Sequence, residues 1–276
     1  MIYRFGVTRR DFVRIVPTLG AFVITTQHVH AQNTDPLAWP APLPTGAQMH
    51  ERFPTQDDFL VKETVGVSHS NLARVKELVQ QHQTLAKASW DWGFGDWETA
   101  LGAASHVGQR AIAEFLIENG APPTIYSATM LGQLGVVTAF AAIIPDVLSL
   151  RGPHGIPLLN HARAGGPQAG EVLKFLQSLP ANAAPVIEPV SPADRSALEG
   201  RYVFGEGSRD GFIVDFAQNT LGITRLGASR RVLNYLGQFT FSPAGAHAVK
   251  LKFDKSEGGI SLSVLDPDLV VRARKG

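Results

Sequence analysis

Cysteine is absent from this chain, and charged residues make up only 18% of its 276 residues. Without cysteine the protein has no disulfides, no thiolate metal ligands and no cysteine nucleophile. The formal net charge is +1, and no stripe of lysine and arginine is present that would form a nucleic-acid-binding surface. We therefore expect stability to come from packing, and we expect no nucleic acid among the partners.

The common catalytic motifs are missing as well. The sequence has no H-E-x-x-H, no G-x-S-x-G, no P-loop and no S-x-x-K. The glycine pairs at 93–95 and 205–207 lack the third glycine of a dinucleotide-binding loop. These absences predict no catalytic residue, no cofactor and no metal ion. They leave open an enzyme whose site no common motif describes.

The apolar run near the N-terminus, Ile15 to Thr25, is short of the roughly 20 residues that cross a bilayer. It follows the basic segment Thr8–Arg14, which contains Arg9 and Arg10, and it precedes Val29-His30-Ala31. This order is typical of a secretory signal, and the paired arginines resemble the twin-arginine (Tat) export motif. The resemblance implies a signal peptide at 1–31 and a periplasmic or secreted mature chain without a membrane span. A buried N-terminal helix or an uncleaved anchor is the alternative.

Two proline-rich stretches, residues 32–58 and 180–192, divide the rest of the chain. Proline at this density disfavours both helices and sheet ladders. We expect an extended leader at 32–58, a helical region at 59–179, a linker at 180–192 and a β-domain at 193–276.

Helical periodicity marks the region 59–179, with apolar residues three and four positions apart, as in Leu72–Val79. The segment Thr99–Gly108 reads TALGAASHVG, and Ile112–Ala121 ends in Gly-Ala. Together they resemble an ankyrin repeat, whose first helix opens T-P-L-H-x-A-A-x-x-G. The resemblance implies a stack of helix pairs that binds a partner on its concave face.

Further copies of this pattern begin near residues 62, 123 and 156. With the copy at 99, the intervals are 37, 24 and 33 residues, and only the last matches the ankyrin period. The short interval predicts the loss of one β-finger, and the long one predicts an enlarged finger at Trp90–Trp97. An irregular helical bundle is the alternative.

From Leu198 onward the apolar period changes to two, as expected for strands. This many short strands predict a small antiparallel barrel or sandwich. The segments Leu198–Tyr202 and Phe241–Gly245 resemble the β-barrel module appended to bacterial β-lactamase-like hydrolases. The predicted strands are 201–204, 212–216, 220–224, 232–236, 239–241, 248–253, 260–264 and 269–273.

The predicted finger contains three of the four tryptophans. We expect Trp97 to be held against the helices, and Trp92 and Phe94 to lie at a flexible tip without a core. Tryptophan is enriched in binding hot spots, so the tip is a candidate recognition element. The alternative is that the rings cap the first helix pair. The candidate ligand contacts are Trp92, Phe94, Asp91, Asp96 and His106.

The histidines suggest less from the sequence alone. His106 lies near the end of an inner helix and is expected to face the concave side. His154 lies in the loop before the fourth copy, and His161 takes a core position, where we expect it to be packed and hydrogen-bonded. Asp91, Asp96 and Glu98 could surround a metal with His106, but their spacing matches no known metal motif.

These features predict an exported, non-catalytic module that recognises a protein or cell-envelope ligand through the concave face and the finger. The alternative is a hydrolase-like enzyme with an unrecognised site where the β-domain meets the helices. The absence of a nucleophile or metal motif favours the binding module.

Overall fold

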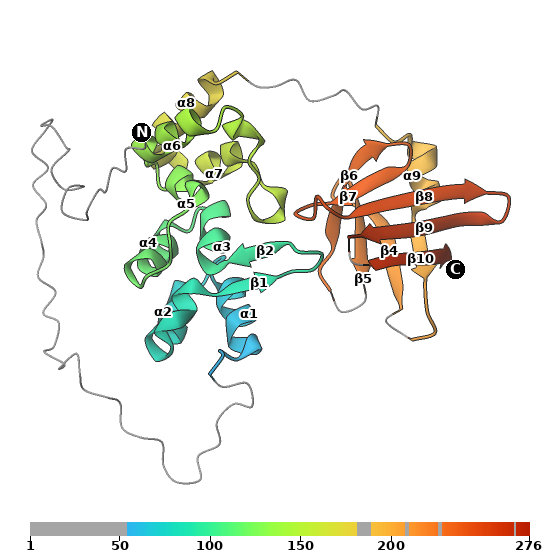
Figure 1. Ribbon diagram of the computed structural model, residues 1–276, viewed down its shortest axis with the longest axis horizontal. Helices are drawn as coiled ribbons and strands as arrows, with labels where there is room; N and C mark the ends of the chain where they lie inside the picture. The colour runs from blue at the N-terminus through green and yellow to red at the C-terminus, as the bar shows by residue number, and fades with distance from the viewer. Residues whose placement is uncertain (1–53, 181–188, 208–209, 226–227, 268) are drawn as a thin grey trace, which may run out of the picture. The chain divides into compact units, whose positions relative to one another are not determined.

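The computed structural model describes residues 54–180 and 189–276, except residues 208–209, 226–227 and 268. The expected signal peptide, almost all of the expected leader and most of the expected linker lie outside the described residues. A helical part is followed in the chain by a closed antiparallel β-barrel (Figure 1). This confirms the predicted fold class of a helical region joined to a small all-β domain.

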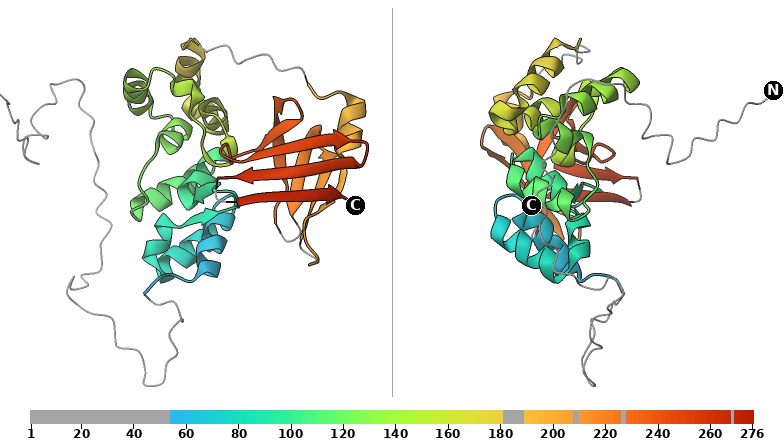
Figure 2. Two further views of the ribbon diagram at one scale, coloured as in Figure 1. Left: turned by 45° about the vertical axis from the view of Figure 1, so that its right-hand side comes forward. Right: turned by 90° about the vertical axis from the view of Figure 1, so that its left-hand side faces the viewer.

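The helical part consists of four successive helix pairs, one at each of the four predicted copies. The first helices of the pairs pack against one another in the order α1, α3, α5, α7. The pairs follow one another along the part from blue to yellow in Figures 1 and 2. The helices are α1 (Asp58–Val67), α2 (Leu72–Gln81), α3 (Ala100–His106), α4 (Arg110–Glu118), α5 (Ile125–Met130), α6 (Leu134–Ile143), α7 (Leu158–Ala164) and α8 (Gly170–Ser178).

Local signals explain where these helices begin and how closely they pack. Thr99 is the N-cap of α3, and its hydroxyl accepts a hydrogen bond from the Gly102 amide at 2.9 Å. Asn71 caps α2 in the same way through the Arg74 amide. Gly108 has a φ of +77°, and a Cβ there would collide with the Ala164 carbonyl. Glycine at this turn therefore allows two helix pairs to approach closely.

A two-stranded hairpin joins the first two helix pairs. It consists of β1 (Ser89–Asp91) and β2 (Trp97–Thr99), with Trp90 opposite Glu98. Gly93, Phe94 and Gly95 form its tip, and all three have positive φ. The enlarged finger predicted at Trp90–Trp97 is therefore present as this hairpin.

All eight predicted strands of the β-domain are present and close into a barrel in the order β10-β3-β4-β5-β6-β7-β8-β9. Tyr202, Phe241 and Phe253 fill its interior, and the Tyr202 hydroxyl donates to the Leu198 carbonyl at 2.8 Å. Leu198 ends the short helix α9 (Pro192–Leu198), which packs against β4. The strands are β3 (Gly200–Val203), β4 (Gly211–Ala217), β5 (Thr220–Arg225), β6 (Arg231–Gly237), β7 (Thr240–Pro243), β8 (Lys250–Ser256), β9 (Gly259–Asp266) and β10 (Leu269–Lys275).

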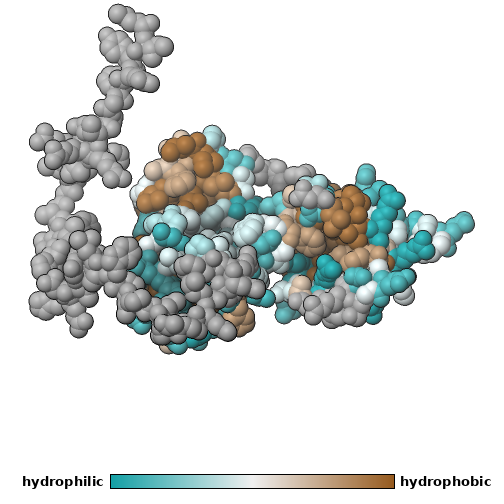
Figure 3. All heavy atoms as spheres, turned by 60° about the horizontal axis from the view of Figure 1, so that its bottom comes forward, coloured by the Kyte–Doolittle hydropathy of each residue, from teal (hydrophilic) through white to brown (hydrophobic). Residues whose placement is uncertain are grey.

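Apolar surface gathers on one side of the helical part (Figure 3). Helix α6 exposes four large apolar side chains, those of Leu134, Val136, Phe140 and Ile143. With ten residues, α6 is too short to cross a bilayer. None of the helices in the described part of the chain combines the length and apolar character of a membrane crossing.

Candidate functional site

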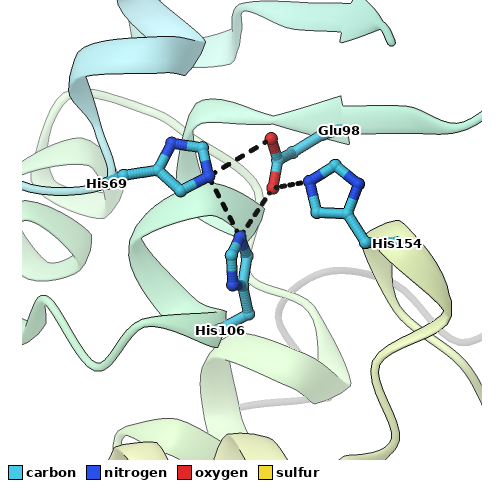
Figure 4. Close-up of side chains that lie close together, drawn as sticks. All are labelled: His69, Glu98, His106 and His154. Carbon is cyan, nitrogen blue, oxygen red and sulfur yellow. Dashed lines mark hydrogen bonds and ion pairs between the residues drawn. The ribbon is translucent and has the colours of Figure 1, made fainter. Parts of the chain in front are cut away.

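Four side chains from separate elements converge in the helical part: His69, Glu98, His106 and His154 (Figure 4). His69 lies in the turn between α1 and α2, and Glu98 lies on β2. His106 is the last residue of α3, and His154 belongs to the 3₁₀ turn Pro153–Gly155. One nitrogen or oxygen atom from each residue lies within 4.8 Å of those from the other three.

Two of these histidines come together from the first two helix pairs. His69 follows Ser68, and His106 follows Ser105, at corresponding positions of the first two helix pairs. Each serine hydroxyl donates to the carbonyl four residues earlier, on Thr64 and Leu101 respectively. Because adjacent pairs pack in parallel register, the two imidazole Nε2 atoms meet at 3.1 Å.

Glu98 is the fully buried centre of the cluster. Strand alternation turns its side chain inward between the exposed Trp97 and Thr99. Its Oε1 lies 2.9 Å from His106 Nε2 and 3.3 Å from His154 Nε2. Its Oε2 lies 3.6 Å from His69 Nε2 and accepts a hydrogen bond from the Trp92 indole at 2.8 Å.

Two of the three imidazoles are oriented through their other nitrogen. Nδ1 of His69 lies 2.9 Å from the Gly66 carbonyl, which can only accept, so this nitrogen carries the proton. Nδ1 of His154 lies 2.7 Å from the buried carboxylate of Asp96, which also accepts from the His154 backbone amide at 2.9 Å. In both residues Nε2 is thereby directed at the centre of the cluster.

The charges in the cluster are strongly coupled. Burial alone would raise the pKa of Glu98, but hydrogen bonds with His106 and His154 outweigh burial and lower this pKa to about 2. Burial opposes the charged form of His154, but Asp96 and Glu98 raise its pKa to about 9. For Asp96, the hydrogen bonds with His154 and Arg231 outweigh burial and lower the pKa. The site therefore holds two carboxylates that favour nearby positive charge.

A pocket of about 310 Å³ opens beside the cluster. His69, Trp92 and His154 line it from the helical part, and residues Ser229 to Arg231 line it from the barrel. Arg231 also pairs with Asp96 through Nη1. The cluster is thus accessible from one side, where His69 and His154 remain partly exposed.

The structure places the five predicted contact residues in different roles. His106 belongs to the cluster, and Asp96 is the carboxylate partner of His154. Trp92 donates to Glu98, and Asp91 accepts from the Gly93 amide at 2.8 Å within the hairpin turn. Phe94 packs against the core of the barrel. Of the five predicted contact residues, His106 and Asp96 are therefore the two whose titratable groups lie beside the other histidines of the site.

The expected placements of Trp97, Trp92 and Phe94 were wrong, whereas the alternative that rings of the finger cap the first helix pair fits Trp90 and Trp92, which pack against the helical core. Trp97 was expected to lie against the helices, but its side chain is 62% exposed because it alternates with the inward-facing Glu98. Trp92 and Phe94 were expected to lack a core. Trp92 instead packs against the helical core, and Phe94 packs against the barrel.

The spacing of Asp91, Asp96, Glu98 and His106 did not reveal this cluster, because its four groups come from four separate elements. Sequence reasoning missed His69 altogether. A usable signal was present, since His69 and His106 lie 37 residues apart and this equals the interval between the first two copies. His161 is buried as expected, and its ring nitrogens meet no hydrogen-bond partner of good geometry among the described residues. Burial lowers its pKa, and an interaction with the Ser105 backbone opposes this by raising the pKa.

No protein-family model matches the chain, and no curated protein matches its sequence. The interpretation of the site therefore depends on its own geometry and chemistry.

Proposed function

We propose that this protein binds a divalent transition-metal ion, best matched by Zn²⁺, through His69, Glu98, His106 and His154. The observation that carries the proposal is the convergence of three imidazole Nε2 atoms and one carboxylate within 4.8 Å. Imidazole and carboxylate are the donors that zinc takes when cysteine is absent.

The separations between these atoms support a tetrahedral ion. Zinc bonds of about 2.0–2.1 Å to nitrogen or oxygen place the four ligands about 3.3 Å apart. Oε1 of Glu98 lies 2.9 and 3.3 Å from Nε2 of His106 and His154, and the Nε2 atoms of His69 and His106 are 3.1 Å apart, all near that value. One donor atom from each of the four residues lies within 4.8 Å of the others. Small rotations of the side chains would therefore be enough to coordinate an ion at the centre.

The hydrogen bonds behind the ligands also support the proposal. Metal-binding histidines usually donate their other ring N–H to a carboxylate or a backbone carbonyl, which fixes the tautomer. His154 has this arrangement with Asp96, and His69 has it with the Gly66 carbonyl. Trp92 holds Glu98 in the same indirect way.

The rival explanation is a buried ion-pair network in which protonated histidines neutralise Glu98. Such a network has a high desolvation cost and contributes little net stability. It would also need a proton between the Nε2 atoms of His69 and His106. A single cation at the centre would balance all four groups at once.

Equilibrium dialysis with Zn²⁺, followed by metal analysis, tests the proposal. We expect one ion per chain, and we expect His106→Ala and Glu98→Gln to weaken binding by at least about 100-fold, since ligand removal should exceed the 10–100-fold effect of outer partners. His82→Ala is the matched control, because His82 is exposed and outside the cluster. Absence of stoichiometric zinc, or equal binding by the variants and the wild type, would reject the metal centre.

In the wider proposal, the protein is an exported, non-catalytic binding protein of ankyrin-repeat type. The match between the four helix pairs and the four sequence copies supports the repeat assignment, and the Arg9-Arg10 segment supports Tat export to the periplasm or beyond. A protein or cell-envelope component is the proposed partner. Replacing Arg9 and Arg10 by lysine should retain the protein in the cytoplasm. Export of this lysine variant at the level of the wild type would argue against the Tat route.

Metal-dependent hydrolysis is the second candidate, favoured by the pocket beside the cluster. Catalytic zinc sites keep an open position for water, whereas four protein ligands complete a tetrahedron. This difference favours a binding role. Ester hydrolysis by the zinc-loaded protein, lost in Glu98→Gln, would instead favour the enzyme.

A further inference from the structure

We infer that the pocket beside the cluster binds an amphipathic organic acid, with the carboxylate at Arg231 and the apolar body at the mouth of the barrel. This inference rests on Arg231, the hairpin tip and the barrel and does not require the metal ion, although His69 and His154 of the cluster also line the pocket.

Arg231 supplies the first argument. Its side chain is about nine-tenths buried, and its Nη1 is engaged by Asp96 and by the Ala244 carbonyl. Its Nη2 is buried and makes no hydrogen bond with any described residue. A buried, charged donor without an acceptor is costly, so an anionic group in the adjoining pocket would satisfy it.

The charge of the pocket supplies the second argument. Arg230 and Arg231 line this pocket, Arg225 and Arg231 line the apolar pocket that adjoins it, and the described lining residues of the two pockets include no carboxylate. Arg230 forms an ion pair with Asp215 and donates to the Thr220 carbonyl. Arg231 forms an ion pair with Asp96, so the carboxylates that balance these two arginines lie outside the lining. This lining favours an anion over a cation or a neutral molecule.

A neighbouring apolar pocket supplies the third argument. It has a volume of about 270 Å³ and is lined by Phe94, Phe212 and Ile223. Trp92, Ser229 and Arg231 line both pockets, so the two adjoin one another at these residues. Binding sites of roughly 300–1,000 Å³ with apolar walls and a few polar groups are typical of small-molecule ligands.

The combined shape and chemistry therefore fit one ligand class: a small acid with a hydrocarbon or aromatic body. Phe94 reaches this place because the hairpin tip, with three successive positive φ angles, directs its ring against the barrel core. The tip is then one wall of a binding site, and the candidate ligand contacts Trp92 and Phe94 serve an acid rather than a protein surface.

Isothermal titration with octanoate, acetate and octylamine tests this inference. We expect octanoate to bind at least about 100-fold more tightly than acetate, because its additional methylenes enter the apolar pocket. We expect no binding of octylamine, which carries the opposite charge. Equal affinity for octanoate and acetate, or binding of octylamine, would overturn the inference.

Variants locate the site. Arg231→Met should weaken octanoate binding at least about tenfold, whereas Arg272→Met, an exposed barrel arginine, should not change it. Arg231 also contacts Asp96, so a second variant guards against misfolding. Ala228→Phe fills the apolar pocket from an exposed position and should weaken octanoate binding by a similar factor. Wild-type affinity in a folded Arg231→Met or Ala228→Phe protein would overturn the inference.

The same titrations with zinc-loaded and chelator-treated protein separate the two proposals. Octanoate binding without zinc binding would reject the metal centre and leave the acid site standing. Zinc binding without octanoate binding would do the reverse.

Discussion

The helical part and the barrel both have well-packed apolar cores, but they bury different polar side chains. The helical part buries Asp96, Glu98 and His161, whereas the charged side chain that the described barrel buries is Arg231. Burial of an ionisable group is costly unless it is paired, and such groups gather where a protein binds or reacts. The comparison indicates that the helical part carries the proposed metal centre and that the barrel mainly provides one wall beside it.

The largest expected effect is a loss of stability in the barrel, which tests whether the barrel and the metal centre have separate roles. Phe253→Ala removes a fully buried ring and should cost about 3–5 kcal/mol of unfolding free energy. Urea unfolding followed by circular dichroism measures this loss, and Lys252→Ala, on the exposed side of the same strand, is the control. Zinc affinity of the folded variant should be unchanged. Loss of zinc binding in a folded Phe253→Ala protein would show that the two parts do not have separate roles.

His161 provides a pH test of the helical part. Burial lowers its pKa to about 4, with a smaller contribution from the charge of His106. The unfolded chain takes up a proton on this residue below about pH 6.5, whereas the folded chain resists protonation down to about pH 4. Stability should therefore fall by about 3 kcal/mol as the pH falls through this window.

The matched variant for this test is His161→Phe, which keeps a ring next to Tyr126. The difference in unfolding free energy between wild type and variant should change with pH between about 6.5 and 4. Parallel pH profiles for the two proteins would show that His161 gains a partner in solution that the structure does not include.

A smaller effect is expected at Trp92. Trp92→Phe keeps the packed ring but removes the indole donor to Glu98, so zinc affinity should fall by about tenfold. Trp90→Phe is the control. Trp90 packs against the same core, but the indole hydrogen bond to Glu98 comes from Trp92. Equal zinc affinities for the two variants would show that the indole does not position Glu98.

The smallest effect is expected at Trp97. Its exposed ring should contribute less than about 0.5 kcal/mol, so thermal unfolding of Trp97→Ala should resemble that of the wild type. A loss comparable to that of Trp92→Ala would restore the sequence-based expectation that Trp97 is held against the helices.

Much of the fold could be predicted from the sequence because its signals are local. Alternation of period two located every barrel strand, and helical periodicity with turn glycines such as Gly108 located the four helix pairs. The intervals between the copies also located the hairpin at Trp90–Trp97. Each of these signals lies within a few dozen residues of the element that it predicts.

The candidate site could not be predicted in the same way. His69, Glu98 and His154 meet only after helix pairs stack and a hairpin folds over them, so no local spacing records their contact. The direction of the finger side chains depends on strand phase, which turns Glu98 inward and Trp97 outward, and the position of Trp97 next to the second helix pair did not reveal that phase. Two sequence signals did bear on the cluster: the equal placement of His69 and His106 in successive copies, and the acidic residues, Glu98 among them, shortly before His106.

X-ray absorption at the zinc edge of the loaded protein tests the central claim most directly. The proposed centre predicts a four-coordinate ion with nitrogen and oxygen neighbours at about 2.0–2.1 Å and with the outer-shell scattering of three imidazoles. In His106→Ala, one imidazole contribution should be lost. A six-coordinate shell of oxygen atoms, or a spectrum that His106→Ala leaves unchanged, would contradict a metal centre built from His69, Glu98, His106 and His154.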